Sequence, residues 1–250
     1  MPDISWFGWS AMAAGALLIG ISKTGFPGAG ILSVLLMAAA VPAKASTGLI
    51  LPLLILGDIF AVAYYRRHAV WSHLLRLIPC AAAGVVLGYL AMGKVNDDQL
   101  RRIIGGAILG MLTLSWLRNR RPQADMHVPI AWWFPVVIGL LAGVTTMMCN
   151  AAGPIMVIYL LAMRLPKDAF IGTGAWYYLL LNSFKVPFSA NLGLIAGQSL
   201  SVNLALAPLV VIGALAGVRL VKLVPEKAFT TIVQVLAAGA AVLLLLPRLR

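Results

Sequence analysis

Charged residues are scarce in this sequence. Only 10% of its 250 residues are Asp, Glu, Lys or Arg, and just seven residues are acids, whereas soluble domains average about 25% charged residues. Hydrophobic residues instead make up 62% of the chain, and its mean hydropathy is +0.97. So few polar groups cannot cover the surface of a soluble domain of this length. The composition therefore excludes a soluble globular domain and indicates a polytopic membrane protein.

Residues that form disulfides or hold metals are equally few. The two cysteines, Cys80 and Cys149, lie in apolar segments, and the three histidines have no acidic or cysteine neighbours at ligand spacing. Neither a disulfide framework nor a metal site is predicted. The chain also has no Walker loop, dinucleotide-binding fingerprint or nucleophile–base arrangement. We therefore expect no cofactor and no ATP-driven transport within this chain, and we do not expect an enzyme.

The excess of basic residues has a topological explanation. The formal net charge is +12, but the basic residues form short clusters between apolar segments. Such clusters are typical of the cytoplasmic loops of membrane proteins. The pattern argues against a nucleic-acid partner and predicts the lipid bilayer as the surroundings of the protein.

Long apolar runs divide the chain into membrane segments, since a helix needs roughly 20 residues to cross the hydrocarbon core of a bilayer. Six runs fit single spans, at 47–65, 77–93, 103–117, 169–188, 204–222 and 228–246. Two further regions, 6–41 and 130–164, are too long for one span. Each is predicted to form a broken, re-entrant helical hairpin that enters and leaves the membrane on one side. The predicted fold is all-α.

Each of the two long regions contains a glycine-bounded polar break. The breaks are Gly20–Gly30 (GISKTGFPGAG) and Gly143–Gly153 (GVTTMMCNAAG). Lipid offers no hydrogen-bond partners, so non-helical chain persists at membrane depth only where protein or a water-filled cavity satisfies its backbone. Matching breaks in two halves of one chain indicate a substrate site built from half-helices.

The two halves of the chain can be aligned with each other. The matching positions are Gly20/Gly143, Gly30/Gly153, Pro42/Pro166, Gly48/Gly172, Asp58/Asn182, Pro79/Pro208, Gly84/Gly213 and Gly88/Gly217. We interpret the agreement as an internal duplication, with a first repeat at 1–117, a basic cytoplasmic linker at 118–129 and a second repeat at 130–250. Chance agreement in a glycine-rich membrane chain is the alternative.

The basic loop residues predict that the two repeats are inverted. Clusters of Lys and Arg place cytoplasmic loops near 66–76, 118–121, 164–167 and 219–227, whereas the uncharged stretch 190–203 suits the outer face. The first hairpin then enters from outside and the second enters from the cytoplasm. Lys94, Arg101 and Arg102 fall on the proposed outer side and count against this orientation.

The residues around the breaks favour an anion. Half-helices that begin near 28–30 and 151–153 would point their N-termini into one cavity near the midplane, and a helix N-terminus carries free N–H groups and about half a positive charge. Glycines allow a ligand to approach the backbone, and hydroxyl and amide groups supply donors. The candidate substrate-binding residues are Ser22, Thr24, Gly25, Gly28, Gly30, Thr145, Thr146, Asn150 and Gly153. The alternative is that the glycines only allow close helix packing.

Lys23, Lys185 and Asp58 are ionisable residues inside the predicted membrane segments and outside the basic loop clusters. Such residues are rare in membranes and face the protein interior or a wet pathway. We expect both lysines to bind the substrate, together with Asn182, the neutral counterpart of Asp58. A structural pair, or a lysine that extends to the interface, is the alternative. Asp58 either neutralises one lysine in the empty state or takes up a proton as a coupling group, unless its hydrogen bonds are purely structural.

The first break followed by an apolar helix, the second break ending in Asn150–Pro154 (NAAGP) and the total length resemble the sulfite exporter TauE/SafE family of membrane permeases. The resemblance covers essentially the whole chain. It implies a multi-pass secondary transporter of the bacterial inner membrane that moves sulfite, sulfoacetate or another organosulfonate. The half-helix termini and Lys23 would hold this small anionic substrate during alternating access. Met147, Met148 and Cys149 in the second break suggest a larger, more apolar substrate.

Two other classes of function stay open at this point. Cys149 beside a helix N-terminus would have an activated thiolate, which suits an intramembrane enzyme or an assembly factor that acts on a lipid or a thiol. An anion channel would need a continuous wet pore instead of a closed site. A homodimer is compatible with each of these functions.

Overall fold

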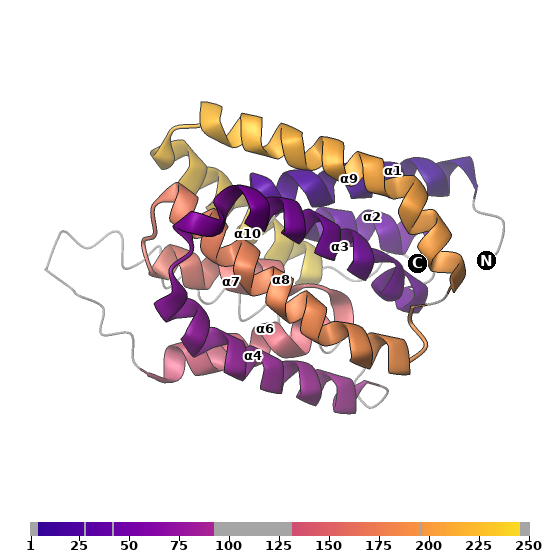
Figure 1. Ribbon diagram of the computed structural model, residues 1–250, viewed down its shortest axis with the longest axis horizontal. Coiled ribbons are helices and arrows are strands. Elements are labelled where there is room, and N and C mark those ends of the chain that lie inside the picture. The colour runs from indigo at the N-terminus through magenta and orange to yellow at the C-terminus, as the bar shows by residue number, and fades with distance from the viewer. Residues whose placement is uncertain (1–4, 28, 42, 93–131, 196, 246–250) are drawn as a thin grey trace, which may run out of the picture.

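The computed structural model describes residues 5–27, 29–41, 43–92, 132–195 and 197–245, and within these ranges it contains helices and no strands (Figure 1). The helices of the first half are α1 (Trp6–Thr24), α2 (Gly30–Ala40), α3 (Ala43–Tyr65), the short 3-10 helix η1 (Arg66–His68) and α4 (Trp71–Ala91). Those of the second half are α6 (Trp133–Cys149), α7 (Ala152–Ala162), α8 (Lys167–Asn191), α9 (Gly197–Leu223) and α10 (Glu226–Leu245). The predicted all-α class is confirmed.

Several of these helices suit a membrane. In the described part of the chain, three helical segments are long and apolar enough to cross one: Ser46–His68, Trp71–Ala91 and Ser199–Leu223. They overlap the predicted spans at 47–65, 77–93 and 204–222, and α8 and α10 overlap those at 169–188 and 228–246. The predicted span at 103–117 and the linker at 118–129 lie outside the described residues. Composition and helices together indicate a membrane protein.

Each long region consists of two helices that pack against each other, α1 with α2 and α6 with α7. The breaks between them are shorter than the sequence indicated, because α1 continues through Gly20 to Thr24 and α6 continues through Gly143 to Cys149. The breaks are therefore the few residues before Gly30 and the pair Asn150–Ala151. The second helices begin at Gly30 and Ala152, within the predicted ranges.

Local sequence explains where each break lies. Pro27 lacks a backbone N–H and disfavours helical geometry in the residue before it, which ends the helical path after α1. The second break is made by Asn150, whose φ of 54° is left-handed, a conformation that asparagine adopts more readily than most residues. Its N–H donates to the Thr146 carbonyl at 3.1 Å, which satisfies the end of α6.

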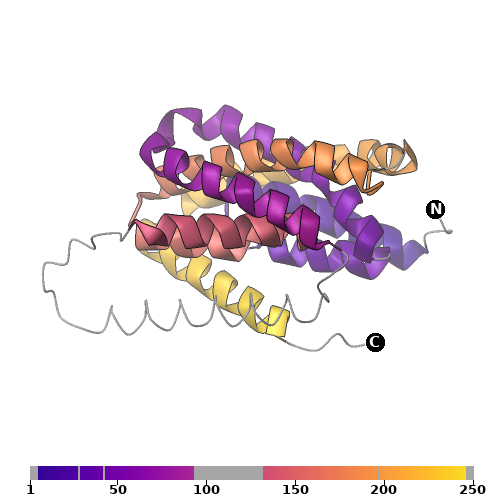
Figure 2. The same ribbon diagram turned by 90° about the horizontal axis from the view of Figure 1, so that it is seen from below.

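The hairpins pack on helices from the opposite half of the chain. Helix α1 lies along α9, and α6 lies along α4, while α3 and α8 contact each other between these two pairs. Figure 1 shows the α1–α9 pair and the α4–α6 pair at opposite edges of the bundle. Figure 2 shows α10 crossing the bundle obliquely, and it contacts α7.

Glycines make these two cross-half contacts close. A Cβ on Gly20 would overlap the backbone of α9 around Gly213, and a Cβ on Gly213 would overlap the backbone of Leu17 in α1. A Cβ on Gly143 would overlap the backbone of α4 around Gly84 in the same way. Close packing through small residues is common between membrane helices. The packing alternative is therefore the right interpretation for Gly20 and Gly143.

Replacing Gly20 or Gly143 by Leu should destabilise the fold by about 1–3 kcal/mol or more, because the added side chain must force two helix backbones apart. The measurement is the thermal unfolding midpoint of purified protein in detergent. Gly239→Ala is the matched control, since Gly239 also lies within a helix and a Cβ there meets no atom within 4 Å. An unchanged midpoint in the leucine variants would contradict the packing described here.

Candidate functional site

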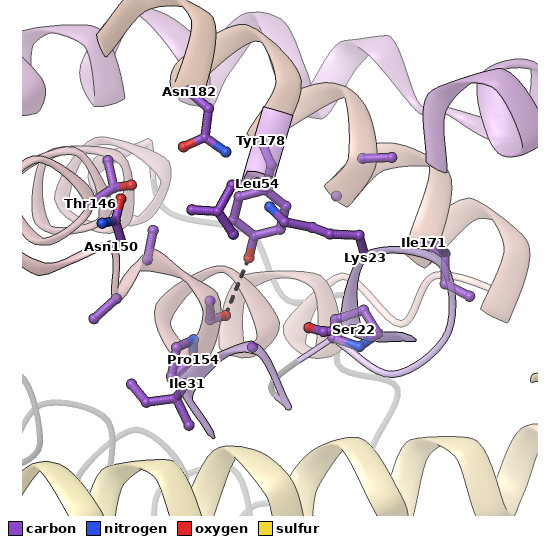
Figure 3. Close-up of a pocket in the computed structure, with 17 residues that line it drawn as sticks. Ser22, Lys23, Ile31, Leu54, Thr146, Asn150, Pro154, Ile171, Tyr178 and Asn182 are labelled. Carbon is purple, nitrogen blue, oxygen red and sulfur yellow. Dashed lines mark hydrogen bonds between the residues drawn. The ribbon is translucent and has the colours of Figure 1, made fainter. Parts of the chain in front are cut away.

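A pocket lies between the two hairpin breaks, against α3 and α8 (Figure 3). Its volume of about 50 Å³ is enough for a small polyatomic ion or a few water molecules. Its lining consists of Ser22, Lys23, Pro27, Gly30, Ile31, Leu54, Thr146, Asn150, Ala151, Ala152, Gly153, Pro154, Ile171, Gly174, Ala175, Tyr178 and Asn182. Both halves of the chain therefore contribute to one site.

Seven of the predicted site residues line this pocket: Ser22, Lys23, Gly30, Thr146, Asn150, Gly153 and Asn182. Three others point elsewhere. The Thr24 hydroxyl donates to the carbonyl of Ala214 at 2.7 Å, Gly25 faces the backbone of Gly217, and the Thr145 hydroxyl donates to the Ala142 carbonyl at 3.1 Å. Gly28 lies outside the described residues.

Lys23 is the cation that lines the pocket. Its Nζ lies 2.7 Å from Oδ1 of Asp58 and 4.2 Å from the centroid of the Tyr178 ring, and Figure 3 shows its side chain extending across that ring. The Lys23 side chain is 11% exposed, whereas that of Asp58 is fully buried. A ligand in the pocket would therefore meet the lysine without reaching the carboxylate.

Asp58 joins the two halves of the chain at the contact between α3 and α8. Its second oxygen, Oδ2, accepts a hydrogen bond from Nδ2 of Asn182 at 2.7 Å. Of the two partners that the sequence offered to this acid, Lys23 forms the ion pair and Lys185 does not. The carboxylate is thus engaged on both oxygens, by an ammonium and by an amide.

Lys185 is 1% exposed and lies behind the pocket wall. Its Nζ donates to the carbonyl and the hydroxyl of Thr146, at 3.0 and 3.3 Å, and to Oδ1 of Asn150. The alternative that this lysine reaches the interface is wrong, because its ammonium is held by two residues that line the pocket. Asn150 in turn donates from Nδ2 to the Thr47 carbonyl at 3.2 Å.

The two breaks are fastened near opposite ends of α3. On the first hairpin, the carbonyl of Thr24 accepts a hydrogen bond from the hydroxyl of Tyr65, the last residue of α3, at 3.0 Å. On the second, Asn150 binds Thr47, close to the start of the same helix. Leu54, midway along α3, lines the pocket. The breaks therefore do not meet end to end, and the pocket lies between them.

Two helix N-termini face the pocket. Helix α2 begins at Gly30 and α7 begins at Ala152, and neither first turn has a side-chain cap. Gly30 and Ile31 of the first α2 turn, and Ala152 and Gly153 of the first α7 turn, line the pocket. Uncapped N–H groups and the helix dipole make such ends favourable for an anion.

Tyr178 is a pocket residue that the sequence analysis missed. Besides its contact with Lys23, its hydroxyl donates to the Gly153 carbonyl at 3.4 Å, drawn as the dashed line in Figure 3. A signal was available, because Tyr178 precedes Asn182 by four positions and Lys185 by seven. These spacings place all three residues on one face of a helix.

Met147, Met148 and Cys149 of the predicted second break do not line the pocket. Met147 is fully buried in the core, where its side chain lies against Gly88 of α4. Met148 packs against the same core. Cys149 donates from Sγ to the Thr145 carbonyl at 3.4 Å. The suggestion that these residues indicate a larger, more apolar substrate is therefore not supported by their positions. Among the described residues, no group of three or more His, Cys, Asp or Glu could hold a metal ion.

Comparison with protein families gives one clear result. Residues 12–244, nearly the whole chain, match the family model described as sulfite exporter TauE/SafE. No curated protein and no solved structure matched the chain. A match of this extent shows that the chain belongs to the sulfite exporter TauE/SafE family, a family of membrane permeases for sulfur compounds.

Proposed function

We propose that the protein is a secondary transporter that moves a sulfur-containing oxyanion, such as sulfite, sulfoacetate or another organosulfonate, by alternating access. The observation that carries this proposal is Lys23, a largely buried cation that lines a pocket between two uncapped helix N-termini. The family supports transport of a sulfur compound across a membrane. The positive charge and the helix N-termini at the pocket support an anionic substrate.

The donors around the pocket suit an oxyanion better than a cation. Lys23 provides a positive charge, Ser22 a hydroxyl, and the first turns of α2 and α7 provide backbone N–H groups. Asp58, the buried carboxylate beside Lys23, does not line the pocket. Hydrogen bonds from charged donors to oxyanions are stronger than neutral ones. The volume of about 50 Å³ is enough for a small oxyanion.

Asp58 is proposed as the coupling group. When a bound anion draws Lys23 toward the pocket, Asp58 loses the ammonium at 2.7 Å and keeps only the hydrogen bond from Asn182. A buried carboxylate without its ion-pair partner is costly. Proton uptake by Asp58 would remove that cost, and this would link anion binding to proton movement.

Alternating access is proposed to follow from the two-repeat plan. The predicted alignment pairs Gly20 with Gly143 and Gly213 with Gly84, and these residues form the same contact twice, α1 on α9 and α6 on α4. Each hairpin therefore packs on a helix from the other half of the chain. This reciprocal packing supports inverted repeats that move relative to each other around a fixed site. One hairpin break is fastened near each end of α3, so each would control one entrance.

The orientation is proposed from the basic end of the bundle, with the protein in the inner membrane. The start of α8 and the end of α9 lie together, because Lys167 donates from Nζ to the carbonyls of Val221 and Val224, both at 2.9 Å. Lys222 lies over the ring of Tyr64 at 5.2 Å, which adds the end of α3. An accumulation of Lys and Arg marks a cytoplasmic end.

Thiol labelling tests this orientation, in a protein whose two native cysteines are replaced by Ser. Gly197→Cys, at an exposed position where a Cβ meets no atom within 4 Å, should react with a membrane-impermeant maleimide added to intact cells. Arg219→Cys, also at an exposed position, should react only after the cells are opened, because it lies at the basic end. The reverse pattern would contradict the proposed orientation and would leave the pocket unaffected.

Replacing Lys23 by Met should weaken oxyanion binding at least about tenfold, because one charged hydrogen bond to the anion is lost. Thermal stabilisation of purified protein by sulfite, with chloride as the reference anion, measures the effect. Lys222→Met is the matched control, since Lys222 is exposed and does not line the pocket. Equal stabilisation of the Lys23 variant and the wild type would remove Lys23 from the site.

A further inference from the structure

We infer that the protein binds an anionic phospholipid on its outer surface, where the end of α3 meets the end of α9. The inference goes beyond the proposed function and does not depend on which substrate is transported. It rests on two features that lie together: exposed basic residues at the ends of both helices, and an exposed apolar surface directly beside them. A phospholipid with a negatively charged headgroup has the matching pair of features, a phosphate and acyl chains.

One face of α9 carries both features. Ile212 and Leu215 are 56% and 50% exposed. Arg219 and Lys222 follow them along the helix and are also exposed. The spacing of these four residues, three or four positions from one to the next, places their side chains on the same side of the helix. This face is therefore apolar along the helix and basic at its end.

The end of α3 lies beside this face. Nζ of Lys222 is 5.2 Å from the centroid of the Tyr64 ring, and Figure 1 shows both helix ends at the same end of the bundle. Tyr64 is 46% exposed, and the half-buried Phe60 precedes it by about one helical turn. Arg66 and Arg67, both exposed, directly follow α3. The two helix ends thus supply a basic cluster, which consists of Arg66, Arg67, Arg219 and Lys222.

No residue of the basic cluster forms an ion pair with an acid in the part of the chain that the structure describes. Lys222 contacts a neutral ring instead. The acids at this end of the bundle have other roles. Oε1 of Glu226 accepts a hydrogen bond from the backbone N–H of Lys167 at 3.0 Å, and Asp168 lies in the first turn of α8, where a negative charge stabilises the helix. The basic cluster is therefore free to bind a phosphate.

The surroundings of the basic cluster favour a lipid as the source of that phosphate. Ile212 and Leu215 are exposed on a helix that is long and apolar enough to cross a membrane, so acyl chains cover them. Basic residues beside such a surface attract negatively charged headgroups, and each one near the membrane strengthens binding by about fivefold. Tyr64 suits the same place, because tyrosine rings favour the boundary between membrane and water.

A lipid bound here would stabilise a junction between α1, α3 and α9. Tyr65, the neighbour of Tyr64, donates from its hydroxyl to the Thr24 carbonyl at 3.0 Å. The Thr24 hydroxyl donates to the Ala214 carbonyl of α9 at 2.7 Å. The end of the first hairpin helix is thus joined to both helices that carry the basic cluster. Because a ligand that binds only the folded protein stabilises it, anionic lipid should raise the thermal unfolding midpoint.

Lipid titration of the purified full-length protein in detergent tests this inference, with native mass spectrometry to measure bound phosphatidylglycerol or phosphatidylcholine. The double variant Arg219→Gln, Lys222→Gln should weaken phosphatidylglycerol binding at least about tenfold, because it removes two charges from the basic cluster. The matched control Arg164→Gln, Lys227→Gln also removes two charges from exposed positions, but these lie outside α3 and α9. The control should bind phosphatidylglycerol within about twofold of the wild type.

Three outcomes would overturn the inference. Equal weakening in both double variants would mean that the overall charge of the protein attracts the lipid. Phosphatidylglycerol that binds no more tightly than phosphatidylcholine would show that the headgroup charge is not recognised. Glycerol phosphate, which has a phosphate but no acyl chains, should not displace the lipid, and displacement at equal concentration would assign the basic cluster to a soluble phosphate ester. Each of these outcomes leaves oxyanion transport unaffected, because the basic cluster does not line the pocket.

Discussion

The ion pair between Lys23 and Asp58 is the interaction on which the centre of this molecule depends. Either charge alone would be costly to bury among membrane helices, and each offsets the other. The pair joins the first hairpin to α3, and the hydrogen bond from Asn182 adds α8 from the other half of the chain. Three helices therefore converge on one carboxylate, and the pocket lies beside it. Any ligand that attracts Lys23 therefore acts on the carboxylate that Asn182 of the other half also binds.

The broken helices obey a related constraint, because lipid cannot satisfy a free backbone group. The end of α1 is satisfied by protein, through the bond from Tyr65 to the Thr24 carbonyl. The end of α6 is satisfied by its own C-terminal turn and by Lys185, which donates to the Thr146 carbonyl. Each additional unwound residue would add another donor and acceptor to be paired. This explains why the breaks are only a few residues long although the polar, glycine-bounded segments around them are longer.

Hydropathy and spacing were sufficient to predict the helical class and the starts of α2 and α7, whereas the re-entry of each helix pair into the membrane stays a prediction. They placed the start of α4 six residues late, at 77 instead of Trp71, because its first turns carry polar residues such as His73 and Arg76. They also assigned Gly20 and Gly143 to breaks, since a sequence does not show which glycine has a neighbouring helix against it. Seven of the predicted site residues line the pocket, and their role in substrate binding stays a prediction. The choice of Lys23 over Lys185 as the partner of Asp58 needed three-dimensional distances.

The predicted repeat gives a nearly symmetric frame, but the charges within it are not symmetric. In the alignment that pairs Gly20 with Gly143, Lys23 corresponds to Thr146, and Thr146 receives the ammonium of Lys185 from α8. Each hairpin end is therefore next to one ammonium, supplied by different helices. Among the described residues, only the first of these ammonium groups is paired with a carboxylate, because the counterpart of Asp58 is the neutral Asn182. The loss of symmetry at this one pair of residues thus leaves one carboxylate beside two lysines, and that carboxylate is engaged by Lys23 and by the amide of Asn182.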